Sequence, residues 1–143
     1  MSRIRKILLA EDNPDDAELT LFGLRTMAPG IEVDVVRDGL EVMDYLGANG
    51  PDAAKPEVLP SLILLDVKMP RMDGLAVLAA IKRHPELRRI PVVMLTSSRE
   101  PRDIAESYDL GANAYLVKSM ELDDFIAAIG VAQKFWIEVN ELP

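Results

Sequence analysis

Apolar residues along the chain fall into five short runs, and each run is followed by a segment with helical spacing. Three of the runs, Ile7–Leu9, Leu62–Leu65 and Val92–Leu95, are apolar without alternation. This pattern is typical of strands in a parallel sheet whose two faces are both covered by helices. The run at Ile31–Val36 alternates instead, as an edge strand does. The predicted strands are Ile4–Ala10, Ile31–Val36, Leu62–Leu65, Pro91–Leu95 and Ala114–Val117.

The segments between the runs carry signals for helix starts. Asn13 followed by Pro14 is a helix cap with proline at the first helical position. Asp38 with Glu41 three residues later matches a capping box. Ser119 is the expected N-cap of the last helix. The other predicted helices cover Gly74–Arg83, Pro101–Leu110 and Met120–Trp136.

The regular alternation of strand and helix predicts an α/β fold. Five repeats of the pair give a (βα)5 unit, in which a doubly wound, five-stranded parallel sheet carries helices on both faces. The chain has 143 residues, which is room for one domain. We expect that domain to cover residues 1–143, with a short tail over about 135–143. Gly47–Pro60 holds two glycines and three prolines and is predicted to be a surface loop.

Composition and charge exclude several classes of function. The chain has no cysteine, so disulfides, thiol catalysis and iron–sulfur clusters are ruled out. Sixteen Lys and Arg against 24 Asp and Glu give a net charge of −8, which repels nucleic acid and anionic lipid. No apolar stretch approaches the ~18 residues of a membrane span. We therefore expect a cytoplasmic protein with no nucleic-acid or membrane partner.

Polar side chains follow the carboxyl ends of four predicted strands, where open parallel sheets bind their ligands. Each taken alone has an ordinary structural interpretation, as a helix cap, a turn residue or a surface lysine. Their convergence at one edge, with complementary chemistry, favours a functional site. The residues are Glu11 and Asp12 after the first strand, Asp66 after the third, Thr96 at the fourth and Lys118 after the fifth.

The types of these side chains predict a reaction. Clustered carboxylates repel one another unless a divalent cation joins them, and all-oxygen ligation suits Mg²⁺. An aspartate beside such a metal can attack phosphorus and form an aspartyl-phosphate. Thr96 and Lys118 can then donate hydrogen bonds to the transferred phosphoryl group.

Four motifs make the chain resemble the receiver domains of response regulators over nearly its whole length. They are ILLAEDN at 7–13, LLDVKMP at 64–70 with Asp73-Gly74, PVVMLT at 91–96, and GANAYLVK at 111–118. The resemblance implies a flavodoxin-like sheet and a protein that catalyses only its own phosphorylation and dephosphorylation.

The same resemblance implies a role for each site residue. Asp66 would be the phosphoacceptor. The Mg²⁺ site would use Asp12 directly, Glu11 through water, Asp66, and the backbone carbonyl of Lys68. Thr96 and Lys118 would contact the phosphoryl group, and Thr96 and Tyr115 would shift position on activation.

A narrower resemblance concerns single-domain regulators that are paired with bacterial phytochrome kinases. It rests on the long loop, on Arg89–Val93, on Ser107–Gly111 and on Phe135-Trp136. It implies that a sensor histidine kinase supplies the phosphoryl group and that the signal leaves through altered protein contacts.

The apolar C-terminal residues suggest a homodimer formed through the last helix and the tail. Phe135, Trp136, Ile137, Val139 and Leu142 gather there, although aromatic residues are only 5% of the chain. Two alternatives stay open: Trp136 folds back onto its own sheet, or the patch binds the kinase.

Ser119 stands where receivers usually have proline after the lysine, often with a cis peptide bond. A cis bond without proline costs ~2.5–4 kcal/mol. The sequence therefore leaves the geometry of the Lys118–Ser119 bond, and with it the direction of the ammonium, open.

Three other functions compete with phosphotransfer signalling. One is a degenerate receiver that acts only as a protein-interaction module. Another is a Mg²⁺-dependent phosphatase of the haloacid dehalogenase type, which needs an acidic residue where this chain has Lys68. The third is a flavodoxin-like flavin module, whose phosphate the acidic segment Glu11–Asp16 would repel.

Overall fold

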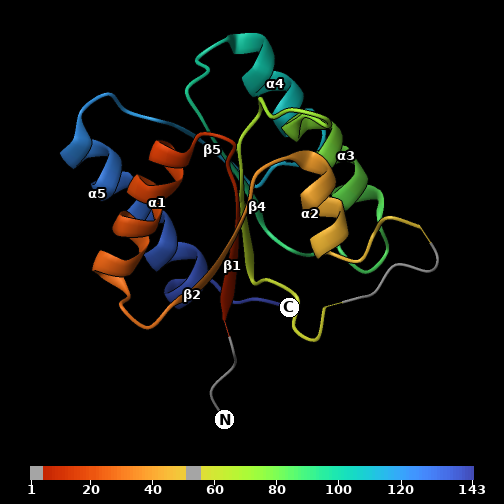
Figure 1. Cartoon of the computed structure of the whole chain (residues 1–143), viewed down its shortest axis with the longest axis horizontal. Helices are drawn as coiled ribbons and strands as arrows, with labels where there is room; N and C mark the ends of the chain where they lie inside the picture. Colours follow the sequence, from red (N-terminus) through yellow and green to blue (C-terminus); the bar gives the residue numbers. More distant parts are fainter. Residues whose placement is uncertain (1–4, 51–55) are drawn as a thin grey trace.

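The structure, a computed structural model, describes residues 5–50 and 56–143. Within these ranges five parallel strands form one sheet in the order β2-β1-β3-β4-β5 (Figure 1). The predicted fold class is confirmed. The strands are β1 (Lys6–Ala10), β2 (Glu32–Val36), β3 (Leu62–Leu65), β4 (Val92–Thr96) and β5 (Ala114–Val117).

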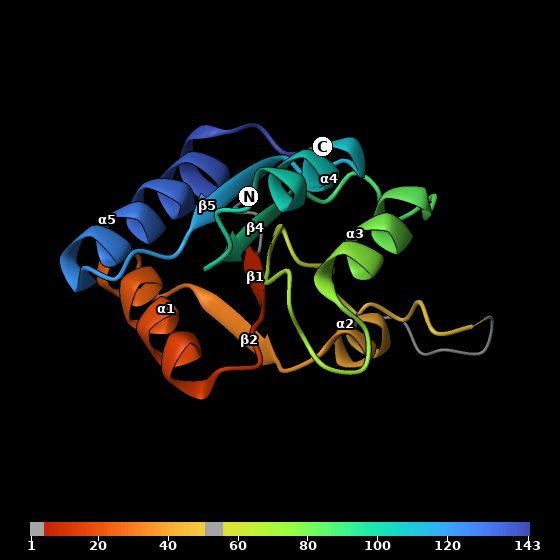
Figure 2. The same cartoon turned by 90° about the horizontal axis from the view of Figure 1, so that it is seen from above.

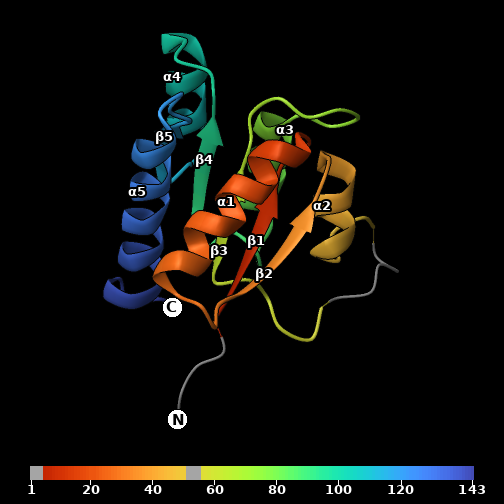
Figure 3. The same cartoon turned by 60° about the vertical axis from the view of Figure 1, so that its left-hand side comes forward.

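Helices cover both faces of the sheet. α1 and α5 lie on one face, and α2, α3 and α4 lie on the other, as the views from above and from the side show (Figures 2 and 3). Their bounds are α1 (Pro14–Met27), α2 (Gly39–Tyr45), α3 (Gly74–Arg83), α4 (Pro101–Asp109), α5 (Leu122–Gln133) and a π-helix, η1 (Lys134–Val139).

Two hydrophobic clusters pack against the two faces of the sheet. Because consecutive strand residues point to opposite faces, Leu8 and Ile63 enter the cluster under α2 and α3, while Ile7 and Leu64 enter the one under α1 and α5. This explains why the central strands are apolar at every position. β2 lies at one edge of the sheet and is less buried than its neighbour β1, as its alternating sequence predicted.

Side chains cap the first two helices where the sequence indicated. The carboxamide oxygen of Asn13 accepts the backbone N–H groups of Asp15 (2.9 Å) and Asp16 (3.1 Å). The carboxylate of Asp38 accepts the N–H of Glu41 at 2.9 Å. In a capping box the Glu41 carboxylate would accept the N–H of Asp38. Here it accepts the N–H of the preceding residue, Arg37, at 3.0 Å.

The last helix differs from its prediction at both ends. Its N-cap is Glu121 rather than Ser119, because the Ser119 hydroxyl accepts the N–H of Glu121 at 3.1 Å and closes a turn before the helix. At the other end the chain stays helical beyond Trp136, as η1. Hydrophobic spacing does not separate an α-turn from a π-turn, so this change of helix type was not predictable.

Parts of the predicted first strand and of the predicted loop are not described by the structure. Ile4 and residues 51–55 of the predicted loop lie outside the described residues. Among the residues described, none forms a cis peptide bond, so the Lys118–Ser119 bond is trans. Within the same ranges, no helix combines the length and apolarity needed to cross a membrane.

Candidate functional site

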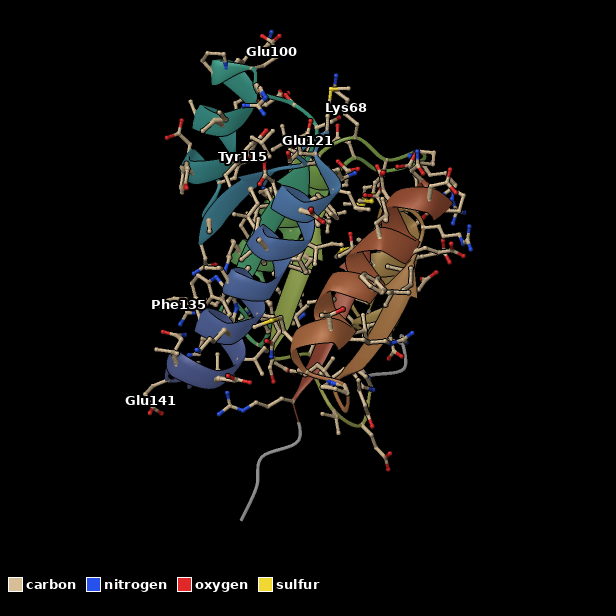
Figure 4. The ribbon with its side chains drawn as sticks, turned by 90° about the vertical axis from the view of Figure 1, so that its left-hand side faces the viewer. Lys68, Glu100, Tyr115, Glu121, Phe135 and Glu141 are labelled. Atoms are coloured by element: carbon tan, nitrogen blue, oxygen red, sulfur yellow. The ribbon has the colours of Figure 1, made fainter. Side chains whose placement is uncertain are left out.

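The predicted site residues meet at the carboxyl edge of the sheet. In Figure 4, Lys68 and Glu121 mark this end of the molecule, and Glu141 marks the opposite end. The edge is held together by backbone bonds between neighbouring strand ends. The N–H of Asp66 bonds to the carbonyl of Ala10 at 3.1 Å, and the N–H of Lys118 bonds to that of Thr96 at 2.8 Å.

Three carboxylates form the centre of the site. Glu11, Asp12 and Asp66 each offer an oxygen, and these oxygens lie within 4.8 Å of one another. Glu11 and Asp66 are buried, with 2% and 7% of their surface exposed, whereas Asp12 is exposed. The cluster is therefore open to solvent on the Asp12 side.

One ammonium group balances part of this charge. Lys118 Nζ forms an ion pair with Glu11 and lies 3.1 Å from Asp66 Oδ2. It also lies 3.0 Å from Asp16 Oδ2. Asp16 belongs to the first turn of α1 and was not among the predicted site residues. Its only signal in the sequence is an acidic residue in a first helical turn, which has an ordinary interpretation as a partner of the helix dipole.

Burial and charge shift the pKa values of two of these groups. Burial, reinforced by the nearby charge of Asp66, raises the pKa of Glu11 to about 7, although its hydrogen bond to Lys118 acts in the opposite direction. Burial alone would lower the pKa of Lys118. The hydrogen bond to Glu11 and the charge of Asp66 outweigh it and hold that pKa above its usual value.

The donor set fits a hard divalent cation. The carboxylates offer oxygen ligands only, one of them faces solvent, and their mutual repulsion would be relieved by a bound cation. Lys68 follows Asp66 by two residues, and its N–H lies 3.4 Å from Asp66 Oδ1. The Lys68 side chain is exposed and points away from the molecule (Figure 4). The backbone of Lys68, and not its side chain, therefore lies beside the carboxylate cluster.

A close approach of two backbone segments positions the loop that follows Asp66. The N–H of Gly74 bonds to the carbonyl of Val67 at 2.7 Å. A Cβ atom at Gly74 would lie 1.9 Å from the carbonyl oxygen of Asp66, so only glycine fits there. Asp73 caps α3 by accepting the N–H of Ala76 at 2.9 Å. The Asp73-Gly74 pair thus seats the start of α3 against the end of β3.

Thr96 and Tyr115 are linked through Ser98. The hydroxyl of Thr96, which is buried, accepts the N–H of Ser98 at 3.3 Å. The Tyr115 hydroxyl donates to the Ser98 carbonyl at 3.0 Å, and Ser98 Oγ donates to Asp103 at 2.5 Å. Tyr115 lies beside α4 (Figure 4). Burial raises its pKa. Both residues therefore bond to the same loop, which follows β4.

The geometry argues against two of the competing functions. A phosphatase of the haloacid dehalogenase type lacks its second acid, since Lys68 occupies that position and is exposed. A flavin phosphate would have to bind at the start of α1, where the Asn13 side chain caps the helix and Glu11 and Asp16 add negative charge.

The fold and the acidic site together define a receiver, and comparison with known proteins agrees. The chain belongs to the response regulator receiver domain family, whose model matches residues 7–130. It is thus a response regulator domain of two-component signalling.

Particular relatives cover almost the full length of the chain. Response regulator Rcp1 of Synechocystis sp. is 42% identical over 137 residues, which are 96% of this chain and 92% of that protein. The solved structure of the phosphorylated cyanobacterial phytochrome response regulator RcpA is 41% identical, covers 99% of both chains and superposes with a TM-score of 0.88. The bacteriophytochrome response regulator AtBRR is 48% identical, covers 98% of this chain and 100% of its own, and has a TM-score of 0.74.

Proposed function

We propose that this protein accepts a phosphoryl group on Asp66, with Mg²⁺ bound, from a phosphohistidine of a sensor histidine kinase. The observation that carries the proposal is the position of Asp66, in the carboxylate cluster and 3.1 Å from the Lys118 ammonium. In the transfer, an Asp66 oxygen forms a bond to phosphorus as the bond from phosphorus to the histidine nitrogen breaks. The imidazole leaves with the electron pair of that bond.

The metal ligands follow from the family resemblance and from the donor set. Asp12 would bind Mg²⁺ directly, Glu11 through water, and Asp66 and the Lys68 carbonyl would complete the protein ligands. A bound Mg²⁺ would offset negative charge on the phosphoryl oxygens. A relative of similar fold supports a divalent-cation site, because one solved structure is the Mn²⁺-bound form of Rcp1, with a TM-score of 0.87 to this chain.

The remaining site residues would act on the phosphoryl group and on its signal. Lys118 would donate to a phosphoryl oxygen, because its ammonium already reaches Asp66. The Thr96 hydroxyl, which accepts the N–H of Ser98, would donate its own proton to another phosphoryl oxygen. Tyr115 would then change its bond to the Ser98 carbonyl. The bonds that Thr96 and Tyr115 both form with Ser98 support the expected switch pair.

The relatives support the choice of partner. RcpA and AtBRR are described as phytochrome response regulators, so the donor proposed here is a phytochrome-type histidine kinase. The unit proposed is one receiver domain over residues 1–143, with a tail over about 135–143. It would act in the cytoplasm through protein contacts, including a homodimer through its last helix and tail. With a net charge of −8, it is proposed to bind neither nucleic acid nor membrane. Beyond its own phosphorylation and dephosphorylation, it is proposed to catalyse no reaction.

Mass spectrometry after exposure to acetyl phosphate, with and without Mg²⁺, tests the phosphoacceptor. A single adduct of ~80 Da should appear with Mg²⁺ and be absent from Asp66→Asn, which keeps the shape of the side chain but loses its nucleophile. An undiminished adduct in the variant would contradict the assignment. No adduct in the parent, from acetyl phosphate or from a phosphorylated kinase, would favour the interaction-only receiver. Steady release of phosphate from unrelated phosphate esters would favour the phosphatase.

A further inference from the structure

Asp16 shares the ammonium of Lys118 with two members of the carboxylate cluster, although it is not itself a member. We propose that Asp16 is a positioning residue. It holds the Lys118 ammonium toward α1 and so limits the competition of that ammonium with Mg²⁺ for Glu11 and Asp66. This inference rests on the proposed function of the site.

The contacts of the ammonium show how the competition arises. A lysine ammonium has three N–H donors, and three carboxylates surround this one: Glu11, Asp66 at 3.1 Å and Asp16 at 3.0 Å. The Lys118 side chain is 9% exposed, so few of its donors can turn to water instead. Each donor used by Asp16 is therefore one that Glu11 and Asp66 do not hold.

The start of α1 holds the backbone of Asp16 in place. The Asp16 N–H bonds to the side chain of the Asn13 cap at 3.1 Å, and its carbonyl accepts the Thr20 hydroxyl at 2.8 Å. α1 also packs along α5, the element that follows Lys118 and its short connecting segment (Figure 2). Asp16 thus belongs to α1, whereas the ammonium that it binds comes from the segment that follows β5.

A carboxylate outside the metal ligand set therefore favours metal binding. Without it, the ammonium binds Glu11 and Asp66 more tightly, and Mg²⁺ has to displace it from both. Asp16 is half-exposed, with 36% of its side chain accessible, so its effect is that of a partly screened ion pair. We expect the dissociation constant for Mg²⁺ to rise about two- to fivefold when this pair is lost.

Isothermal titration calorimetry with Mg²⁺ on the parent, Asp16→Asn and Asp15→Asn tests the inference. Asp15 is the matched control, because it lies in the same first turn and is exposed. In the described part of the chain, its carboxylate forms no ion pair with Lys118. Both variants lose one negative charge near the site, so only the excess loss in Asp16→Asn reports on the ammonium. Equal losses in the two variants would overturn the inference.

A double-mutant cycle separates positioning from a general effect on the fold. In a Lys118→Met background the two asparagine variants should bind Mg²⁺ equally, because the ammonium that Asp16 holds is gone. Lys118→Gln is a second background if the first variant does not fold. An excess effect of Asp16→Asn that persists without Lys118 would overturn the inference. If the parent forms the adduct on Asp66 while the variants are equal, the inference fails and the proposed function stands. A parent that neither binds Mg²⁺ nor gains the adduct overturns both.

Discussion

The guanidinium of Arg71 binds the carboxylate of Asp38 through two nitrogen atoms, with Nε 2.8 Å from Oδ2 and Nη2 3.1 Å from Oδ1. This bidentate pair ties the loop that follows Asp66 to the start of α2, where the same carboxylate caps the helix. Arg71 has a φ of 66°, which is unusual for a residue other than glycine. The hydrogen bonds from Arg71 hold the pKa of Asp38 below its usual value.

The first prediction is that Asp38→Asn lowers the melting temperature at pH 7, because asparagine still caps α2 but loses its charge for Arg71. The pKa of Asp38 is lowered from 3.8 in the folded state, so its contribution to stability is present above pH 3.8 and is lost as the pH falls through the folded value. The melting temperatures of parent and variant should converge as the pH falls below the lowered pKa of Asp38. The control is Asp73→Asn, which changes the cap of α3 in the same way; within residues 5–50 and 56–143, Asp73 forms no ion pair. An equal loss in both variants would assign the effect to the cap alone.

The second prediction is that Mg²⁺ stabilises the fold by relieving the repulsion among Glu11, Asp12 and Asp66. At a hundred times the dissociation constant, linkage gives ~2.7 kcal/mol of unfolding free energy. Asp12→Ala should abolish this response and raise the stability of the metal-free protein, since one of the repelling charges is gone. Thermal melts with and without millimolar Mg²⁺ measure both effects, with Asp15→Ala as the control that keeps the metal response. A parent whose melting temperature ignores Mg²⁺ has no metal site here.

The third prediction is that Gly74→Ala destabilises the protein and impairs phosphorylation together. The added methyl group would meet the Asp66 carbonyl oxygen at 1.9 Å, so either α3 or the end of β3 has to move. Overpacking of this kind costs about 1–3 kcal/mol. Denaturant unfolding gives the first effect, and the rate of adduct formation gives the second. Gly30→Ala is the control, because a Cβ atom there meets nothing within 4 Å. Wild-type kinetics in Gly74→Ala would show that the site tolerates the shift.

Most of the fold could be predicted because its signals are local. The unbroken apolar runs of β1, β3 and β4 follow from burial on both faces, and Asn13 and Asp38 cap the helices that their sequences indicated. The four strand ends could be assigned to one site because parallel strands end at the same edge. Neither the apolar runs nor the shared strand edge depends on how a side chain is oriented.

The features that escaped prediction depend on side-chain direction or on distant contacts. Asp16 reaches Lys118, which lies 102 positions away in the sequence. Arg71 has a positive φ and pairs with Asp38, a residue of a different βα unit. Serine is a common N-cap residue, but the Ser119 hydroxyl accepts the N–H of Glu121 in a turn, and the helix begins after that turn. None of these bonds leaves a periodic pattern in the sequence.

The structure shows which residues of the apolar C-terminal patch are exposed and which are packed against the domain. Phe135 and Val131 are 46% and 70% exposed, whereas Trp136 is half-buried and packs partly against the cluster under α1 and α5. The rings of Phe135 and Trp136 pack edge to face, with their centroids 5.0 Å apart. The patch borders an apolar groove lined by Val93, Ala114, Leu116, Ala127, Ala128, Val131, Ala132, Phe135 and Trp136. Trp136 thus turns partly inward, and Phe135 is the exposed aromatic anchor.

The last prediction is that the protein forms a two-fold symmetric dimer through this patch. In a symmetric pair each Phe135 is buried by the partner copy, so Phe135→Ala removes two anchors at once. We expect light scattering to show a dimer for the parent and an association weakened at least about tenfold for Phe135→Ala. A chain that ends after Gln133 should be monomeric. Phe22→Ala is the matched control, because Phe22 is 59% exposed on α1 and outside the groove. A parent that stays monomeric at high concentration, with and without acetyl phosphate, contradicts the dimer. The patch would then be the surface to test for binding of the kinase.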